Sequence, residues 1–160
     1  MNINFYRLNK TNSYLIFDIN EKPNEINNFL NTCATIIKDV DIFHLKNSAL
    51  NTKELLEIVK TLKLICAEFN VIFILEDRCD IVFTADIDGV FLNKNSFSYN
   101  DAKELLGENK IIGCEAHNNN ADYFVLSDTD TPKDTKIYYS KDKTKLSPLN
   151  NMVYLHRTYL

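Results

Sequence analysis

The sequence predicts an α/β fold in which strand-like and helix-like segments alternate along the chain. The runs SYLIFDI and IFHLK are each followed by a segment whose apolar residues recur every three or four positions. Four later runs, VIFILE, GVFLNK, KIIGCEA and DYFVLSD, are almost continuously apolar, which is typical of strands covered on both faces. Such βα units predict a parallel sheet whose binding residues gather at the carboxyl ends of the strands.

Three segments between these runs predict helices. The first, PNEINNFLNTCATIIKD, has Pro23 where a first helical turn tolerates proline. The second is long, with Thr52 as the expected cap and Asn70 at its end. The third lies in SYNDAKELLGEN, where Ser98 is the expected cap and Gly107 the stop.

After Asp128 the alternation ends. TKIYYS and MVYLHRTYL are strand-like, but no amphipathic helix separates them. A full (β/α)₈ barrel needs at least about 200 residues. The 160 residues of this chain therefore accommodate eight strands only if several helices are missing.

Composition limits the classes of function. The 18 basic and 22 acidic residues contain no basic block, so we expect no nucleic-acid partner. No apolar run approaches the roughly 20 residues that span a bilayer, and MNINFYRLNK is too polar for a secretory signal, so we expect a cytoplasmic protein without membrane contact. The scattered cysteines lack metal-site spacing and are expected to be buried thiols: Cys33, Cys66, Cys79 and Cys114.

Six short motifs occur in order along the chain: YLIFD, HLKNS, LEDR, GVFLNKNS, IIGCEAH and NADYFVLSDTDTPKDTK. Together they resemble the strand-end motifs of thiamine phosphate synthase and the related thiazole tautomerases. The resemblance is clearest from about Tyr14 to Tyr123. It implies a TIM-type (β/α) barrel, trimmed so that the last units lack helices, which forms a single domain over residues 1–160.

The resemblance also implies a set of ligand-binding positions. The family's Q-L-R-x-K motif helps to hold a pyrimidine diphosphate, and here His44 stands for the glutamine and Lys46 for the arginine. Further positions correspond to family residues at the later strand ends, including a displaced remnant of a T-K pair that faces phosphate. The candidate ligand or phosphate contacts are His44, Lys46, Lys94, Glu115, His117 and Lys136.

The family's metal-binding positions match this sequence less well than its ligand-binding positions do. Asp77 of LEDR matches an aspartate that helps to bind Mg²⁺ in the family, and Glu76 beside it is a second candidate oxygen ligand. The family's other metal aspartate is replaced by Ser96. Carboxylates at Glu115 and Asp128 are an alternative route to a cation site on the same rim.

The family's phosphate cradle is expected to be absent in its usual form. That cradle uses glycine-rich turns after the last two strands, because backbone N–H groups approach a phosphate closely only where no Cβ intervenes. The chain has three glycines, and none of them follows Gly113. This favours weakened or lost turnover.

Structural alternatives remain open for each candidate. Asp77 is equally suited to satisfy backbone donors at a helix start. Lysines 46 and 94 are suited to solvated strand ends, histidines 44 and 117 to orienting hydrogen bonds, and Glu115 to an ion pair with either lysine.

Three functions follow from this interpretation. The leading hypothesis is a catalytically degenerate thiamine phosphate synthase-like protein that retains binding of a small phosphorylated or thiazole/pyrimidine-type ligand. The first alternative is an active Mg²⁺-dependent transferase of thiamine biosynthesis, which forms thiamine phosphate from thiazole phosphate and pyrimidine diphosphate. The second is a barrel scaffold without enzymatic activity that assembles as a homo-oligomer.

Overall fold

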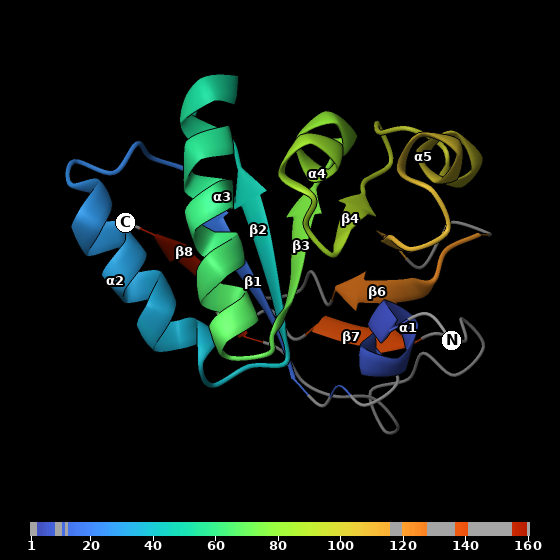
Figure 1. Cartoon of the computed structure of the whole chain (residues 1–160), viewed down its shortest axis with the longest axis horizontal. Helices are drawn as coiled ribbons and strands as arrows, with labels where there is room; N and C mark the ends of the chain where they lie inside the picture. Colours follow the sequence, from blue (N-terminus) through green and yellow to red (C-terminus); the bar gives the residue numbers. More distant parts are fainter. Residues whose placement is uncertain are drawn as a thin grey trace.

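The computed structural model describes residues 3–8, 11, 13–115, 120–127, 137–140 and 155–159. In this part of the chain one eight-stranded sheet is covered by helices on one face (Figure 1). Its strands are β1 (Tyr14–Ile19), β2 (Ile42–Asn47), β3 (Ile72–Glu76), β4 (Gly89–Leu92), β5 (Ile111–Glu115), β6 (Tyr123–Ser127), β7 (Ile137–Ser140) and β8 (Leu155–Tyr159). The helices are α1 (Ile3–Leu8), α2 (Ile26–Ile37), α3 (Thr52–Glu68), α4 (Cys79–Ala85) and α5 (Tyr99–Leu106).

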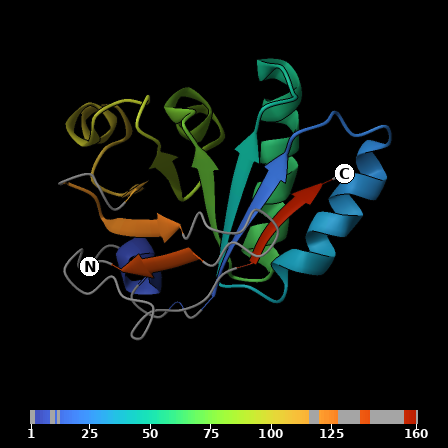
Figure 2. The ribbon, with the colours of Figure 1, turned by 180° about the vertical axis from the view of Figure 1, so that it is seen from behind.

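The strand order is β7-β6-β5-β4-β3-β2-β1-β8, which confirms the trimmed α/β barrel. Strands β1 to β6 pair in parallel with their neighbours in sequence, and β8 adds in parallel to β1. β7 and β8 form the two edges of the described sheet, which curls between them as an open barrel (Figure 2).

β7 departs from the expected parallel arrangement, because it runs antiparallel to β6 with Ser127 opposite Ile137. A parallel return needs a crossover of about a dozen residues or more, usually a helix. The stretch between Ser127 and Ile137 is shorter than that. The apolar run by itself does not encode strand direction, but the short connection does favour an antiparallel return.

Both faces of the sheet are buried along β1 to β6, as the continuous apolar runs indicate. One set of strand residues packs under α2 to α5, and it includes Leu15, Phe43, Phe73, Val90 and Ile112. The alternate residues line the inner face of the curl with Leu8 of α1, and they include Tyr14, Ile42, Ile74, Phe91 and Tyr123. Side chains alternate between faces along a strand, so the inner and outer positions are fixed by register.

Two predicted helix starts are wrong by a few residues. α2 begins at Ile26 with Glu25 at its N-cap, so Pro23 lies before the helix. α3 is capped by Asn51 rather than Thr52, because Asn51 and Glu54 form a reciprocal capping box. The Ser98 cap of α5 is confirmed, with its hydroxyl oxygen accepting from Asp101 N at 3.2 Å.

Aspartates clamp three pairs of strands at their amino ends. Asp41, Asp88 and Asp122 stand just before β2, β4 and β6, and each accepts a backbone N–H from the preceding strand or the residue before it. The bonds are Ser13 N to Asp41 at 2.9 Å, Phe73 N to Asp88 at 2.8 Å and Ile112 N to Asp122 at 2.7 Å. Arg7 of α1 also reaches Asp88 at 3.0 Å, which ties α1 to this end of the sheet.

The cysteines are buried and unpaired as expected, at positions 33, 66, 79 and 114. Burial raises the pKa of Cys114 to about 12 and that of Cys79 to about 11, so neither thiol is prepared for nucleophilic chemistry. Within the described ranges, no helix is long and apolar enough to cross a bilayer.

Candidate functional site

A row of polar side chains lies on the inner face at the carboxyl ends of the strands. In β1, β2 and β3 the inner positions are apolar or aromatic until the last one, which is Asp18, Lys46 or Glu76. Asp18 and Lys46 are register partners, and Leu45 pairs with Leu75, so Lys46 lies between the two carboxylates. The same alternation places Asn93 after β4 and Glu115 at the end of β5 on this face. We call these five residues the inner row.

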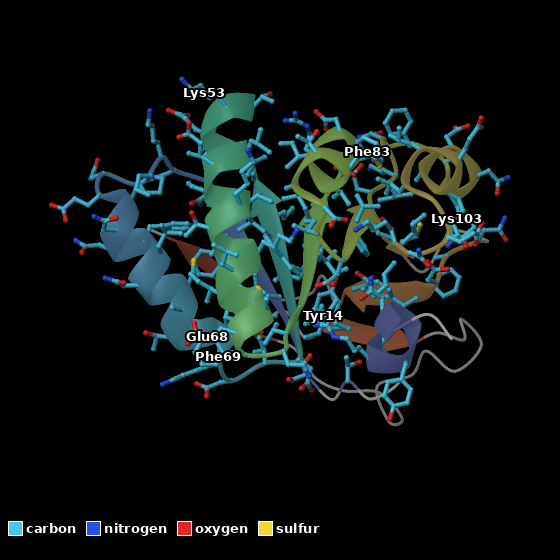
Figure 3. All side chains as sticks on the ribbon, viewed as in Figure 1. Tyr14, Lys53, Glu68, Phe69, Phe83 and Lys103 are labelled. Carbon is cyan, nitrogen blue, oxygen red and sulfur yellow. The ribbon has the colours of Figure 1, made fainter. Side chains whose placement is uncertain are left out.

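His44 lies directly beneath the inner row and is almost fully buried, with 1% of its surface exposed. Its Nδ1 is 2.6 Å from the hydroxyl oxygen of Tyr14, and its Nε2 is 3.1 Å from Oε2 of Glu76. The Tyr14 hydroxyl is also 2.9 Å from that of Tyr123. A chain of four side chains therefore runs from β6 through β1 and β2 to β3. Figure 3 labels Tyr14, its member on β1.

One donor in this chain follows from its acceptor. An ionised Glu76 only accepts, so Nε2–H of His44 donates to it. The other ring nitrogen, Nδ1, pairs with the hydroxyl of Tyr14, which also pairs with the hydroxyl of Tyr123. The chain therefore fixes the ring of His44 between Tyr14 and Glu76.

Glu76 is held in its charged form by this arrangement. Burial raises the pKa of its carboxyl group, but the hydrogen bond and charge of His44, the charge of Lys46 and the side chain of Asn93 act in the opposite direction. Together they keep the pKa of Glu76 below its ordinary value. The side chain is 11% exposed, so the carboxylate is anchored below and accessible above.

Asp77, the principal metal candidate, is engaged in a different contact. Its backbone is left-handed at φ 63°, a conformation that aspartate tolerates better than most residues. Oδ1 accepts from Asn93 N at 2.9 Å, and Oδ2 accepts from the side-chain amide of Asn93. Asp77 N also donates to Phe91 O at 2.9 Å, so the residue ties the end of β3 to the end of β4.

Lys94 is exposed on the loop after β4. It borders a pocket of about 360 Å³ that also includes Asn93, Ser96, Tyr99 and Cys114. The hydroxyl of Ser96, which occupies the place of the family's second metal aspartate, is buried and has no hydrogen-bond partner in the described part of the chain. Lys94 thus belongs to the pocket beside the β4 loop rather than to the inner row.

The donor set of this region does not match a divalent cation. Mg²⁺ requires near-octahedral oxygen ligands, usually including one or two carboxylates. Both oxygens of Asp77 accept from Asn93, one oxygen of Glu76 accepts from His44, and Ser96 is a neutral hydroxyl. Over the residues described, no group of three or more His, Cys, Asp or Glu side chains could hold a metal ion. As arranged, these side chains do not fit Mg²⁺.

Some predicted site residues come together and others cannot be placed. The inner row and the side chain beneath it contain His44, Lys46, Glu76 and Glu115, whereas Asp77 and Lys94 belong to the adjoining β4 loop. His117, Lys136 and Asp128 lie outside the described residues. The roles of all these residues toward a ligand or metal stay predictions.

Tyr14, Tyr123 and Asn93 were not predicted as site residues. A Cβ on Gly113 would lie 2.2 Å from the ring of Tyr123, so glycine at this position lets the ring enter the inner face. Gly113, Tyr123 and Tyr14 all belong to the six motifs, yet the contact of the two tyrosines joins residues 109 positions apart. The motifs were the feature of the sequence that pointed to these residues, but the spacing of the motifs could not reveal the contact between Tyr14 and Tyr123.

Comparison with known proteins gives a consistent result. The family described as "Thiamine monophosphate synthase" matches residues 13–136. A thiamine-phosphate synthase of Campylobacter jejuni (strain 81-176) is 35% identical over 101 residues, covering 62% of this chain and 47% of that protein. One of Clostridium botulinum (strain 657) is 35% identical over 100 residues, covering 57% and 49%.

The fold agrees with a solved relative. The structure of a thiamine phosphate pyrophosphorylase from Pyrococcus furiosus superposes with a TM-score of 0.56 at 30% identity, over 68% of this chain and 51% of that one. This chain spans about half the length of these relatives. The family match covers most of the chain, and the strand order and motif positions agree with it, so the chain belongs to the thiamine monophosphate synthase family.

Proposed function

We propose that this chain is a thiamine phosphate synthase-like protein that binds a thiazole- or pyrimidine-type ligand at the carboxyl ends of its strands and no longer catalyses efficient synthesis. The observation that carries the proposal is the contact between Asp77 and Asn93. The carboxylate best matched to the family's metal ligand is used to join two strand ends.

The charges of the inner row support the proposal that catalysis is weak. Displacement of pyrophosphate requires positive charge directed at the leaving group, and a metal ion or cationic side chains normally supply it. The inner row instead offers the carboxylates of Asp18, Glu76 and Glu115 against the single ammonium group of Lys46. Negative charge accumulating on a leaving pyrophosphate would therefore be repelled.

The geometry nevertheless supports binding. The inner face below the row is a packed wall of aromatic and apolar groups, with Phe91 and His44 in ring contact at 4.9 Å between centroids. Above that wall stand hydrogen-bonding groups whose orientation is set by buried partners, as in most small-molecule sites. A heterocycle with N–H donors would find a fixed acceptor at Glu76, with the carboxylate of Asp18 on the same face.

A turnover assay tests the proposal. Purified protein is given thiazole phosphate, pyrimidine diphosphate and Mg²⁺, and thiamine phosphate is measured by mass spectrometry against a no-enzyme control, with the Campylobacter jejuni relative as positive control. We expect no product above the blank. Product that disappears in Asp77→Asn but not in the exposed-site control Asp39→Asn would support the alternative of an active Mg²⁺-dependent transferase and overturn the degenerate assignment.

A further inference from the structure

We infer that the inner row selects a cationic ligand without a phosphate group, and that Glu76 is the residue that sets this preference. The inference rests on the proposed function, because it assumes that a thiamine-type ligand binds at the strand ends. It goes further by stating which charge the ligand carries and which side chain recognises it.

Lys46 has little positive charge to offer a phosphate. It is flanked by Asp18 on β1 and by Glu76 on β3, and its charge acts on Glu76. Two neighbouring carboxylates lower the positive potential that this ammonium group presents to a phosphate. On these three strands the carboxylates of Asp18 and Glu76 outnumber the one ammonium group of Lys46.

The hydrogen-bond chain beneath Glu76 fixes its charge and its orientation. Because His44 is held between Tyr14 and Glu76 and donates to Oε2, the Glu76 carboxylate is kept ionised and in one orientation. An ionised carboxylate has acceptor oxygens only, so its partner must donate N–H or O–H groups or carry positive charge. A phosphate monoester presents acceptors and negative charge, and both are unfavourable opposite Glu76.

Tyr14 and Tyr123 are positioning residues, since they act on the ligand through His44 and Glu76. Their removal should weaken the preference for thiamine, because His44 then loses the hydrogen bond that holds its ring toward Glu76. The charged groups that face Glu76 are His44 and Lys46 on β2, with Asp18 beyond Lys46 on β1 and the neutral Asn93 after β4.

Thiamine and thiamine monophosphate are the appropriate probes, because they differ only in the phosphate group. Isothermal titration calorimetry of the whole chain should give at least about tenfold tighter binding of thiamine, a ratio of the size expected for one close charge contact. In Glu76→Gln the ratio should fall to within about threefold, whereas Glu68→Gln should leave it unchanged. Glu68 is an exposed control at the opposite end of α3 from Lys53 (Figure 3).

A positioning variant provides the second readout. In Tyr14→Phe the ratio of thiamine affinity to thiamine monophosphate affinity should fall toward that of Glu76→Gln, because His44 loses the hydrogen bond that holds its ring toward Glu76, whereas Tyr6→Phe at an exposed position should leave the ratio unchanged. Tighter binding of thiamine monophosphate than of thiamine would overturn the inference and leave the proposed function standing. Failure of both probes to bind would instead overturn the proposed function itself.

Discussion

The two ends of the parallel strands use the same carboxylate chemistry for different purposes. At the amino ends, Asp41, Asp88 and Asp122 accept backbone N–H groups and join neighbouring strands. At the carboxyl ends, Asp18 and Glu76 stand on the inner face among other side chains. A carboxylate that accepts from the backbone stabilises the fold, whereas one that side chains hold at an accessible edge is available to a ligand.

One carboxylate at each end has a shifted pKa, and the two shifts have opposite signs. Burial raises the pKa of Asp122 more than its backbone hydrogen bond, Lys103 and Tyr99 lower it. Burial also acts on Glu76, but His44, Lys46 and Asn93 outweigh it and the pKa falls. Asp122 thus joins two strands although burial disfavours its charged form, whereas the surroundings of Glu76 favour its charged form.

The largest effect is expected from breaking an amino-end clamp. Asp122→Ala leaves Ile112 N–H and the Tyr99 hydroxyl without their acceptor, which should lower the free energy of unfolding by about 3 kcal/mol. Urea titration followed by circular dichroism measures the change. Asp39→Ala, at an exposed position, is the control and should stay within about 0.5 kcal/mol of the parent. An equal loss in both variants would contradict the clamp.

A smaller loss is expected at the hydrogen-bond chain below the site. Tyr14→Phe removes the hydroxyl that is hydrogen-bonded to both Nδ1 of His44 and the hydroxyl of Tyr123, at a cost of about 2 kcal/mol. Thermal unfolding measures the difference, with Tyr6→Phe at an exposed position as control. If Tyr14→Phe were as stable as its control, the chain would not be formed in solution.

The cap of α3 lies close to the carboxyl end of β2 and should have a smaller effect again. Asn51→Ala breaks the capping box with Glu54 and should cost about 1 kcal/mol. Thr52→Ala should cost less, because its hydroxyl accepts from Arg78 at the protein surface. Chemical unfolding of the two variants side by side gives the order, and a larger loss for Thr52→Ala would restore Thr52 as the cap.

The smallest expected effect is on how the free energy of unfolding depends on pH, where Glu76 and Asp122 should contribute with opposite signs. Because the folded pKa of Glu76 is lowered, its ionisation adds stability that is present above the ordinary value of 4.5 and is lost as the pH falls through the folded pKa. The folded pKa of Asp122 is raised, so its contribution is present below the ordinary value of 3.8 and is lost as the pH rises through the folded pKa.

Unfolding free energies of Glu76→Gln and Asp122→Asn, measured from about pH 3 to 7 and subtracted from the wild type, should show these slopes. The stability advantage of the wild type over Glu76→Gln should grow with pH, and its advantage over Asp122→Asn should shrink. Two slopes of the same sign would mean that the ends do not differ in this way.

Much of this arrangement could be predicted from the sequence. The βα rhythm determines which residues end each strand, so the sequence alone puts His44, Lys46, Glu76 and Glu115 at one end of the sheet. The capping box of α3 was also readable, because Glu54 follows Asn51 by three positions. Contacts that depend on the curl of the sheet could not be predicted from the sequence. Examples are the contact of Tyr14 with Tyr123 and that of Asp77 with Asn93. The direction of β7 could have been predicted from the length of the connection before it, which is too short for a parallel return, but not from the apolar pattern of the strand itself.

The claim that the two ends of the strands have different roles is tested most directly by measuring thiamine affinity and the free energy of unfolding on the same two variants at pH 7. We expect that Glu76→Gln loses about tenfold or more in affinity with its fold intact, and that Asp122→Ala loses about 3 kcal/mol of stability while its folded fraction binds thiamine as the parent does. Loss of affinity in Asp122→Ala at full folding, or unchanged affinity in Glu76→Gln, would contradict this separation.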